Sequence, residues 1–211
     1  MNFTFGILTK YDDEEKLKEV IDSIHNLKIT ENGGDYQVLV IGEKKKEGSK
    51  YERYIYFDES AKPAWITRKK NLLARAANFQ NIVLMHDYFT FDENWYKGFL
   101  EFGNDWDISS CPQYLINGKR HFTDWVCWDS PLFPRYTSLN YDDWSHVQFM
   151  YQSGGFVVAK TQLIIDNPFN EQLSWGQADD VEWSLRVRHR YKYVCNGKSI
   201  VRHNKVHRDA K

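Results

Sequence analysis

The chain has 211 residues, enough for one sizeable hydrophobic core but short for two independent domains. Its 28 basic and 29 acidic residues nearly cancel, which excludes a global charge that would recruit nucleic acid or an anionic membrane. Three separated cysteines without a CxxC pair, no signal peptide and no long apolar run argue against a disulfide framework, a zinc site and a membrane span, and predict a cytoplasmic protein.

Apolar periodicity predicts alternating strands and helices in the first half of the chain. Strands are expected at 3–9, 36–42, 53–58, 81–88 and 105–115. Helices are expected within 12–27, 64–80 and 93–103. Asp12 and Glu15 have the spacing of a capping box for the first of these helices.

The second half begins with an aromatic segment, residues 116–153, that has no sustained period. A long segment of this kind inside a compact domain is typical of a lid or a binding loop. A strand at 154–160, a short helix at 161–167 and a helix within 177–191 follow, the last with Val181, Leu185 and Trp183 facing inward. The final apolar stretches predict a hairpin around Asn196-Gly197.

This alternation predicts an α/β fold with a mainly parallel sheet and helices on both faces. In such folds ligands bind beyond the carboxyl ends of the strands. Asp87 ends one predicted strand, and Thr9 and Glu43 lie at the ends of two others. These three side chains are therefore candidates for a ligand site.

Two polar pairs follow apolar stretches. An aspartate placed as in His86-Asp87 can simply cap the next turn, or it can bind a hard divalent cation such as Mg²⁺ or Mn²⁺. His203 and His207 share a face if their segment is a strand, although a histidine after apolar residues is more often structural. Each pair has a structural and a functional interpretation.

The segment SWGQADDVEW, residues 174–183, leads from a glycine-containing loop into a predicted helix with Asp179 and Asp180 in its first turn. Acidic residues there interact with the helix dipole by about 0.3–1 kcal/mol each and need no other role. Two adjacent carboxylates also resist ionising together, which suits one of them as a general base. Trp175 offers an apolar wall or a stacking face.

Taken in order, these motifs resemble the nucleotide-sugar glycosyltransferases of the GT-A fold. Residues 151–183 are similar to the part of Golgi galactosyltransferases in which a double glycine opens a strand and a Trp-Gly-x-x-acid-Asp motif begins a helix. SIVRH is similar to their late strand, whose histidine binds a metal, and ITRKKNLLARAA to the helix before their metal-binding strand. The resemblance implies one Rossmann-like GT-A domain over 1–211, with a nucleotide-binding half at 1–115 and an acceptor-binding and catalytic half at 116–211.

The resemblance also implies a role for each matching residue. Asp180 would be the catalytic base, with Asp179 beside it contacting the acceptor or the donor sugar. Asp87 and His203 would bind Mn²⁺ or Mg²⁺. The residues implied to bind the nucleotide-sugar are Thr9, Tyr11, Glu43, Arg68, Asn71, His86, Asp87, Gly154, Gly155 and Trp175.

One departure from the family pattern concerns the metal site. The Asp-x-Asp of the family is replaced by His86-Asp87-Tyr88. Three alternatives remain: His86 replaces the first acid, Asp87 acts alone with His203 and the diphosphate oxygens, or metal dependence is lost.

The function implied by the resemblance is metal-dependent transfer of a sugar from a nucleotide-diphospho-sugar, a UDP-sugar by preference, to the hydroxyl of a saccharide or other acceptor, with inversion. No nucleic acid partner is expected. A nucleotidyltransferase is a second interpretation, but TKYDDEE lacks the glycine- and lysine-rich phosphate loop it would need. A non-catalytic carbohydrate-binding relative is a third, because of the aromatic segment and the incomplete Asp-x-Asp. Trp125, Trp128 and Trp144 either stack on an acceptor sugar or pack within a lid.

Overall fold

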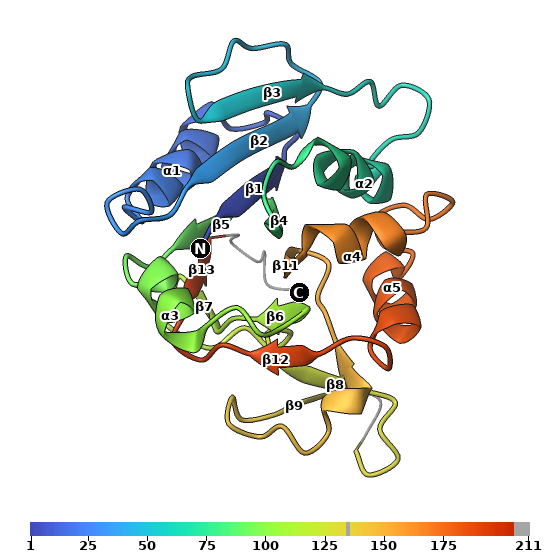
Figure 1. Ribbon diagram of the computed structural model, residues 1–211. Helices are drawn as coiled ribbons and strands as arrows, with labels where there is room; N and C mark the ends of the chain where they lie inside the picture. Colours follow the sequence, from blue (N-terminus) through green and yellow to red (C-terminus); the bar gives the residue numbers. More distant parts are fainter. Residues whose placement is uncertain (134–135, 205–211) are drawn as a thin grey trace.

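The computed structural model describes residues 1–133 and 136–204, and its centre is a seven-stranded sheet of order β12-β6-β11-β4-β1-β2-β3 (Figure 1). The strands are β1 (Phe3–Leu8), β2 (Tyr36–Gly42), β3 (Glu52–Tyr56), β4 (Asn81–His86), β6 (Ile108–Ser110), β11 (Phe156–Lys160) and β12 (Tyr193–Cys195). β11 runs antiparallel to its neighbours β4 and β6, whereas the other neighbours are parallel. The predicted α/β fold with a mainly parallel sheet is confirmed.

Helices cover both faces of this sheet, as the strand and helix alternation predicts (Figure 1). α1 (Glu14–His25) and α3 (Trp95–Phe102) pack on one face. α2 (Ile66–Ala76), α4 (Thr161–Asp166) and α5 (Asp179–Val187) pack on the other. Within the described ranges, no helix has the length and apolar character needed to cross a bilayer.

Two details of the helices differ from the sequence-based expectation. The N-cap of α1 is Asp13, whose side chain accepts the Lys16 N–H at 2.9 Å, so the capping box starting at Asp12 is wrong. The helix begins one residue later than that motif requires. In α5 the inward residues include Trp183 and Val187, whereas Leu185 is 41% exposed.

The predicted C-terminal hairpin is also wrong. β12 pairs in parallel with β6 in the main sheet. β13 (Val201–His203) instead lies between β5 (Phe89–Phe91) and β7 (Gln113–Leu115) in a separate three-stranded sheet. The expected strand at 105–115 divides into β6 and β7 on either side of Pro112, which lacks the N–H that a continuous ladder needs.

The aromatic segment 116–153 contains a third sheet rather than an irregular loop. It consists of β8 (Val126–Trp128), β9 (Tyr136–Ser138) and β10 (Met150–Tyr151), with a short helix, η1 (Val147–Phe149), before β10. Strands of two or three residues are too short to produce a visible period. Trp125 is completely buried and its indole N–H donates to the Asp143 carbonyl at 3.0 Å, so this tryptophan packs inside the segment.

Candidate functional site

The ends of two adjacent parallel strands bring Thr9 and Asp87 together. Leu8 in β1 is paired with His86 in β4, so the residues that follow them lie side by side. The Thr9 hydroxyl donates to Asp87 Oδ2 at 2.5 Å, and the oxygen of that hydroxyl, Thr9 Oγ1, accepts the Tyr11 N–H at 2.9 Å. Tyr11 has a φ of 57°, a strained value for a non-glycine residue. Thr9 therefore stabilises both the turn after β1 and the position of the Asp87 carboxylate.

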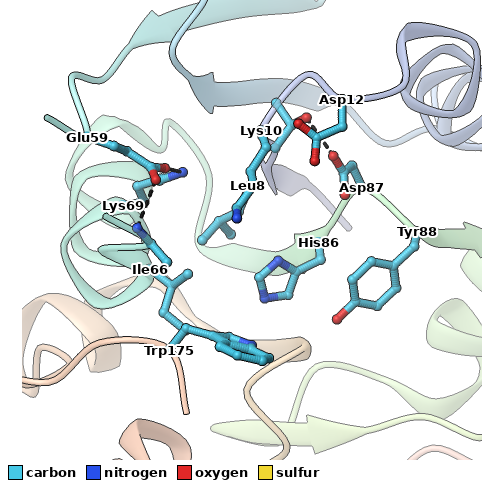
Figure 2. Close-up of a pocket in the computed structure, with 12 residues that line it drawn as sticks. Leu8, Lys10, Asp12, Glu59, Ile66, Lys69, His86, Asp87, Tyr88 and Trp175 are labelled. Carbon is cyan, nitrogen blue, oxygen red and sulfur yellow. Dashed lines mark hydrogen bonds and ion pairs between the residues drawn. The ribbon is translucent and has the colours of Figure 1, made fainter. Parts of the chain in front are cut away.

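A cavity of about 370 Å³ opens at this edge of the sheet, within the size range of small-molecule sites (Figure 2). It lies between the ends of β1 and β4, the start of α2 and the loop before α5. Its lining residues are Leu8, Thr9, Lys10, Asp12, Glu59, Ala64, Ile66, Lys69, His86, Asp87, Tyr88 and Trp175. Four of the predicted site residues therefore share one cavity: Thr9, His86, Asp87 and Trp175.

The Asp87 carboxylate is a partly buried acid that faces this cavity. Burial raises its pKa, an effect that the hydrogen bond from Thr9 opposes. No lysine or arginine in residues 1–133 and 136–204 forms an ion pair with it. A carboxylate that the protein leaves without a cationic partner at a cavity wall suits a hard divalent cation.

His203 does not line the cavity but contacts Tyr88, which does, in a cluster of aromatic side chains. Its ring is buried and stacks on His121, with centroids 4.6 Å apart and an interplanar angle of 15°. It also contacts the ring of Tyr88 at 4.8 Å, and Tyr88 stacks on His86 at 5.3 Å. In the part of the chain that the structure describes, no group of three or more His, Cys, Asp or Glu residues forms a metal cage. Metal binding by His203 stays a prediction, and His207 lies outside the described residues.

Asp179 at the start of α5 forms a buried ion pair with Lys70 of α2. The Lys70 ammonium lies 3.0 Å from Asp179 Oδ2 and 4.6 Å from the centroid of the Phe169 ring. Lys70 is 1% exposed and Asp179 is 5% exposed. Asp179 is therefore turned into the protein and its charge is compensated there, which leaves Asp180 as the more accessible acid of the pair.

Asp180 is held by backbone donors from two segments. Its Oδ2 accepts the Gly154 N–H at 2.9 Å, and its Oδ1 accepts the Val181 N–H at 2.9 Å. A Cβ at position 154 would lie 2.9 Å from Asp180 Cβ and 3.1 Å from the Lys70 ammonium. The first glycine of the pair thus makes room for the acid that follows it by 26 residues.

The replacement Gly154→Ala is expected to destabilise the protein by about 1–3 kcal/mol, because the new methyl group overpacks against the Asp180 stem. Gly155→Ala is the matched control, since its Cβ would meet the Tyr88 hydroxyl at 3.3 Å and ring atoms of Phe89 at 3.5 Å or more. Urea unfolding of both variants measures the difference. Equal free energies of unfolding for the two variants would contradict this account of Gly154.

Nine predicted site residues do not line the cavity: the five described above, Gly154, Gly155, Asp179, Asp180 and His203, and four others, Tyr11, Glu43, Arg68 and Asn71. The Asn71 amide is buried and pairs with the backbone of Phe169 in both directions, each at 2.9 Å. Arg68 is exposed, with its guanidinium over the Trp65 ring at 4.6 Å. The remaining two are Glu43, which is exposed, and Tyr11, which lines a neighbouring groove. Contacts of these residues with a nucleotide stay predictions.

The sequence analysis missed two lysines on the buried face of α2. Lys69 lines the cavity and pairs there with Glu59, whose carboxylate also accepts the Ala64 N–H at 2.9 Å. Lys70 pairs with Asp179, as described above. The available signal was their helical spacing from the apolar residues Ile66 and Leu73, which places both lysines on the inward face.

The sequence and the structure of the chain were compared with those of known proteins. Neither the family models nor the curated proteins contain a match. Among solved structures, TarS 1–349 from S. aureus has a TM-score of 0.66 at 12% identity, covering 97% of this chain and 60% of that chain. The TarS 1–349 complex with UDP-GlcNAc also has a TM-score of 0.66 at 12% identity, covering 100% of this chain and 60% of that chain. GalNAc-T7 with UDP, GalNAc and Mn²⁺ has a TM-score of 0.67 at 11% identity, covering 97% of this chain and 43% of that chain.

These identities are low, so the likeness concerns the fold. It extends over nearly the whole of this chain, whereas the chain spans 60% or less of the three structures compared. The mixed seven-stranded sheet with helices on both faces is therefore a GT-A-like α/β fold, the architecture of nucleotide-sugar glycosyltransferases such as TarS and GalNAc-T7.

Proposed function

We propose that this chain binds a UDP-sugar together with Mn²⁺ or Mg²⁺ and transfers the sugar to an acceptor hydroxyl. The observation that carries this proposal is the cavity at which two strand ends bring Thr9, His86 and Asp87 together. It lies on a fold shared with TarS in complex with UDP-GlcNAc and with GalNAc-T7 bound to UDP, GalNAc and Mn²⁺. Residues 1–115 would bind the nucleotide, and 116–211 would bind the acceptor.

The residues around Asp87 fit a divalent cation. Mg²⁺ and similar cations are commonly bound by one or two carboxylates, with substrate phosphates and water completing the shell. Asp87 would supply the carboxylate, and His203 is the further ligand implied by the family resemblance. A cation bound there offsets the charge that develops on the departing diphosphate.

Asp180 is the residue we assign as the base that removes the acceptor proton. A hydroxyl is a poor nucleophile until a positioned group takes its proton in the transition state. The Gly154 and Val181 N–H groups hold the Asp180 carboxylate in place, while Lys70 compensates the neighbouring Asp179. A base on the acceptor side implies direct displacement and therefore inversion at the sugar carbon.

Saturating UDP and Mn²⁺ together are expected to stabilise the protein, by about 2.7 kcal/mol at a ligand concentration one hundred times the Kd. Differential scanning fluorimetry measures this as a rise in Tm. Asp87→Asn should lose the part of this stabilisation that depends on Mn²⁺. Asp142→Asn, at an exposed aspartate, should retain it. An unchanged Tm of the wild type with both ligands present would contradict nucleotide binding at this site.

A non-catalytic carbohydrate-binding protein is the second candidate function. It is favoured by the incomplete Asp-x-Asp, because the chain has His86-Asp87-Tyr88 in the region where the family has two acids. UDP release distinguishes the two candidates, because a transferase slowly hydrolyses its donor even when no acceptor is present. Purified protein incubated with UDP-GlcNAc and UDP-GalNAc should release UDP from at least one of them if the transferase proposal is correct.

A further inference from the structure

A line of ring contacts connects the cavity with the exposed side chain of Phe122. His86 and Tyr88, which line the cavity, stack with an interplanar angle of 4°. Tyr88 contacts His203, and His203 stacks on His121 with centroids 4.6 Å apart. His121 in turn stacks on Phe122 at 4.9 Å and 29°. The Phe122 ring therefore belongs to an aromatic cluster that includes two residues of the proposed donor site, His86 and Tyr88.

Phe122 is 58% exposed although the backbone around it is well held. Its carbonyl accepts hydrogen bonds from the Tyr136 hydroxyl at 3.1 Å and from Ser138 Oγ at 2.8 Å. The Tyr136 ring contacts the Phe122 ring edge-on, with centroids 5.8 Å apart. An apolar ring fixed in this way, facing solvent, is available for stacking without a large loss of conformational freedom.

Hydrogen bonds of the residue after Phe122 connect this part of the chain with the proposed base, Asp180. Thr123, the next residue, donates its hydroxyl to Ser153 Oγ at 3.3 Å. Ser153 precedes Gly154, whose N–H binds Asp180. The Thr123 hydroxyl also lies 2.8 Å from Nδ1 of His121, the ring that stacks on Phe122. The exposed aromatic ring is thus connected through His121 to two hydroxyl groups, and Ser153, which carries the second, precedes the residue that anchors the Asp180 carboxylate.

The charge of Asp180 acts on two tyrosines of the third sheet. Burial raises the pKa of both Tyr136 and Tyr151, and the negative charge of Asp180 contributes further to each increase. The rings of these two tyrosines are 6.2 Å apart. Tyr136, one of these two tyrosines, also contacts the Phe122 ring.

We propose that Phe122 is the stacking platform for a saccharide acceptor, with the hydroxyls of Thr123 and Ser153 binding the hydroxyl groups of that sugar. A pyranose ring presents an apolar C–H face and a polar rim, which matches an aromatic face bordered by hydroxyl groups. This inference rests on the proposed function, because it assigns the chemical class of the acceptor in that reaction. The platform orients the acceptor and takes no part in proton transfer.

The test uses an array on which free oligosaccharides, lipid-linked glycans and glycopeptides are immobilised, probed with the whole 211-residue chain in the presence of UDP and Mn²⁺. Phe122→Ala is expected to lower the binding of captured oligosaccharides roughly tenfold, and Phe122→Trp to preserve it. Ile116→Ala is the matched control, because Ile116 is 66% exposed in the same segment and lies outside the ring cluster. This control should bind as the wild type does.

Two results would overturn the platform: no capture of any free oligosaccharide by the wild type, whether or not lipid-linked glycans and glycopeptides are captured, or capture by Phe122→Ala equal to that of the wild type. Melting of each variant with UDP and Mn²⁺ separates this inference from the proposed function. If Phe122→Ala is still stabilised by UDP and Mn²⁺ but no longer binds oligosaccharides, the result supports both the platform and the proposed transferase. If oligosaccharide binding depends on Phe122 but UDP and Mn²⁺ do not stabilise the wild type, the result supports the platform and contradicts the proposed transferase.

Discussion

Asp180→Asn is expected to lower the rate of sugar transfer by about 10²- to 10⁴-fold, because the acceptor hydroxyl loses its general base. Asparagine has the same shape, and its amide oxygen can still accept the Gly154 N–H, which now reaches Asp180 Oδ2 at 2.9 Å, at the cost of the weaker local bond from the adjacent Val181 N–H. The substituted protein should therefore fold normally. Binding of UDP and Mn²⁺ should also be unchanged, since Asp180 is not among the residues that line the cavity.

The measurement is the rate of UDP release from the donor sugar, with and without an acceptor, together with the Tm in the presence of UDP and Mn²⁺. Asp166→Asn is the matched control, because Asp166 is an exposed carboxylate at the end of α4 in the same half of the chain. Its turnover should equal that of the wild type. If Asp180→Asn turns over at the wild-type rate, Asp180 is not the base.

Lys70→Met is expected to destabilise the protein by about 3–5 kcal/mol, because it leaves the Asp179 carboxylate buried without its partner. The Lys70 ammonium lies 3.0 Å from that carboxylate, and both side chains are almost inaccessible to water. Desolvating an unpaired charge costs far more than an exposed ion pair contributes. The free energy of unfolding in urea measures the loss.

Two further variants separate the buried pair from a general effect of removing lysines. Lys18→Met removes an exposed lysine that pairs with Asp22, and we expect a cost of less than about 1 kcal/mol. The double replacement Lys70→Met with Asp179→Leu removes both charges and should recover most of the stability lost by the single variant. A cost for Lys70→Met as small as that for Lys18→Met would show that the buried pair does not require its cation.

The position of the candidate site follows from a local pattern and one general rule. Buried apolar runs end at Leu8 and His86, and the carboxyl ends of adjacent parallel strands meet at one edge of a sheet. The observed pairing of those two residues brings Thr9 into hydrogen-bonding contact with Asp87. The sequence was sufficient here because strand ends are marked by a change from apolar to polar residues.

Local sequence patterns could not predict which strands pair when the partners are distant in sequence. β12 and β13 each have three residues, and a strand of this length carries no signal for its partner. They join different sheets, so the turn residues Asn196-Gly197 do not form the predicted hairpin. The short strands of the aromatic segment were missed for the same reason.

The sequence by itself determined the α/β alternation, the inward faces of most helices and the strand edge that holds Asp87, because each depends on periodicity within about 20 residues. Only the tertiary structure decided that Lys70 meets Asp179 across 109 positions and that Phe122 joins the ring cluster at the cavity. The compensation of a buried charge depends on which groups the fold brings within a few ångströms. Local pattern carries no record of that distance.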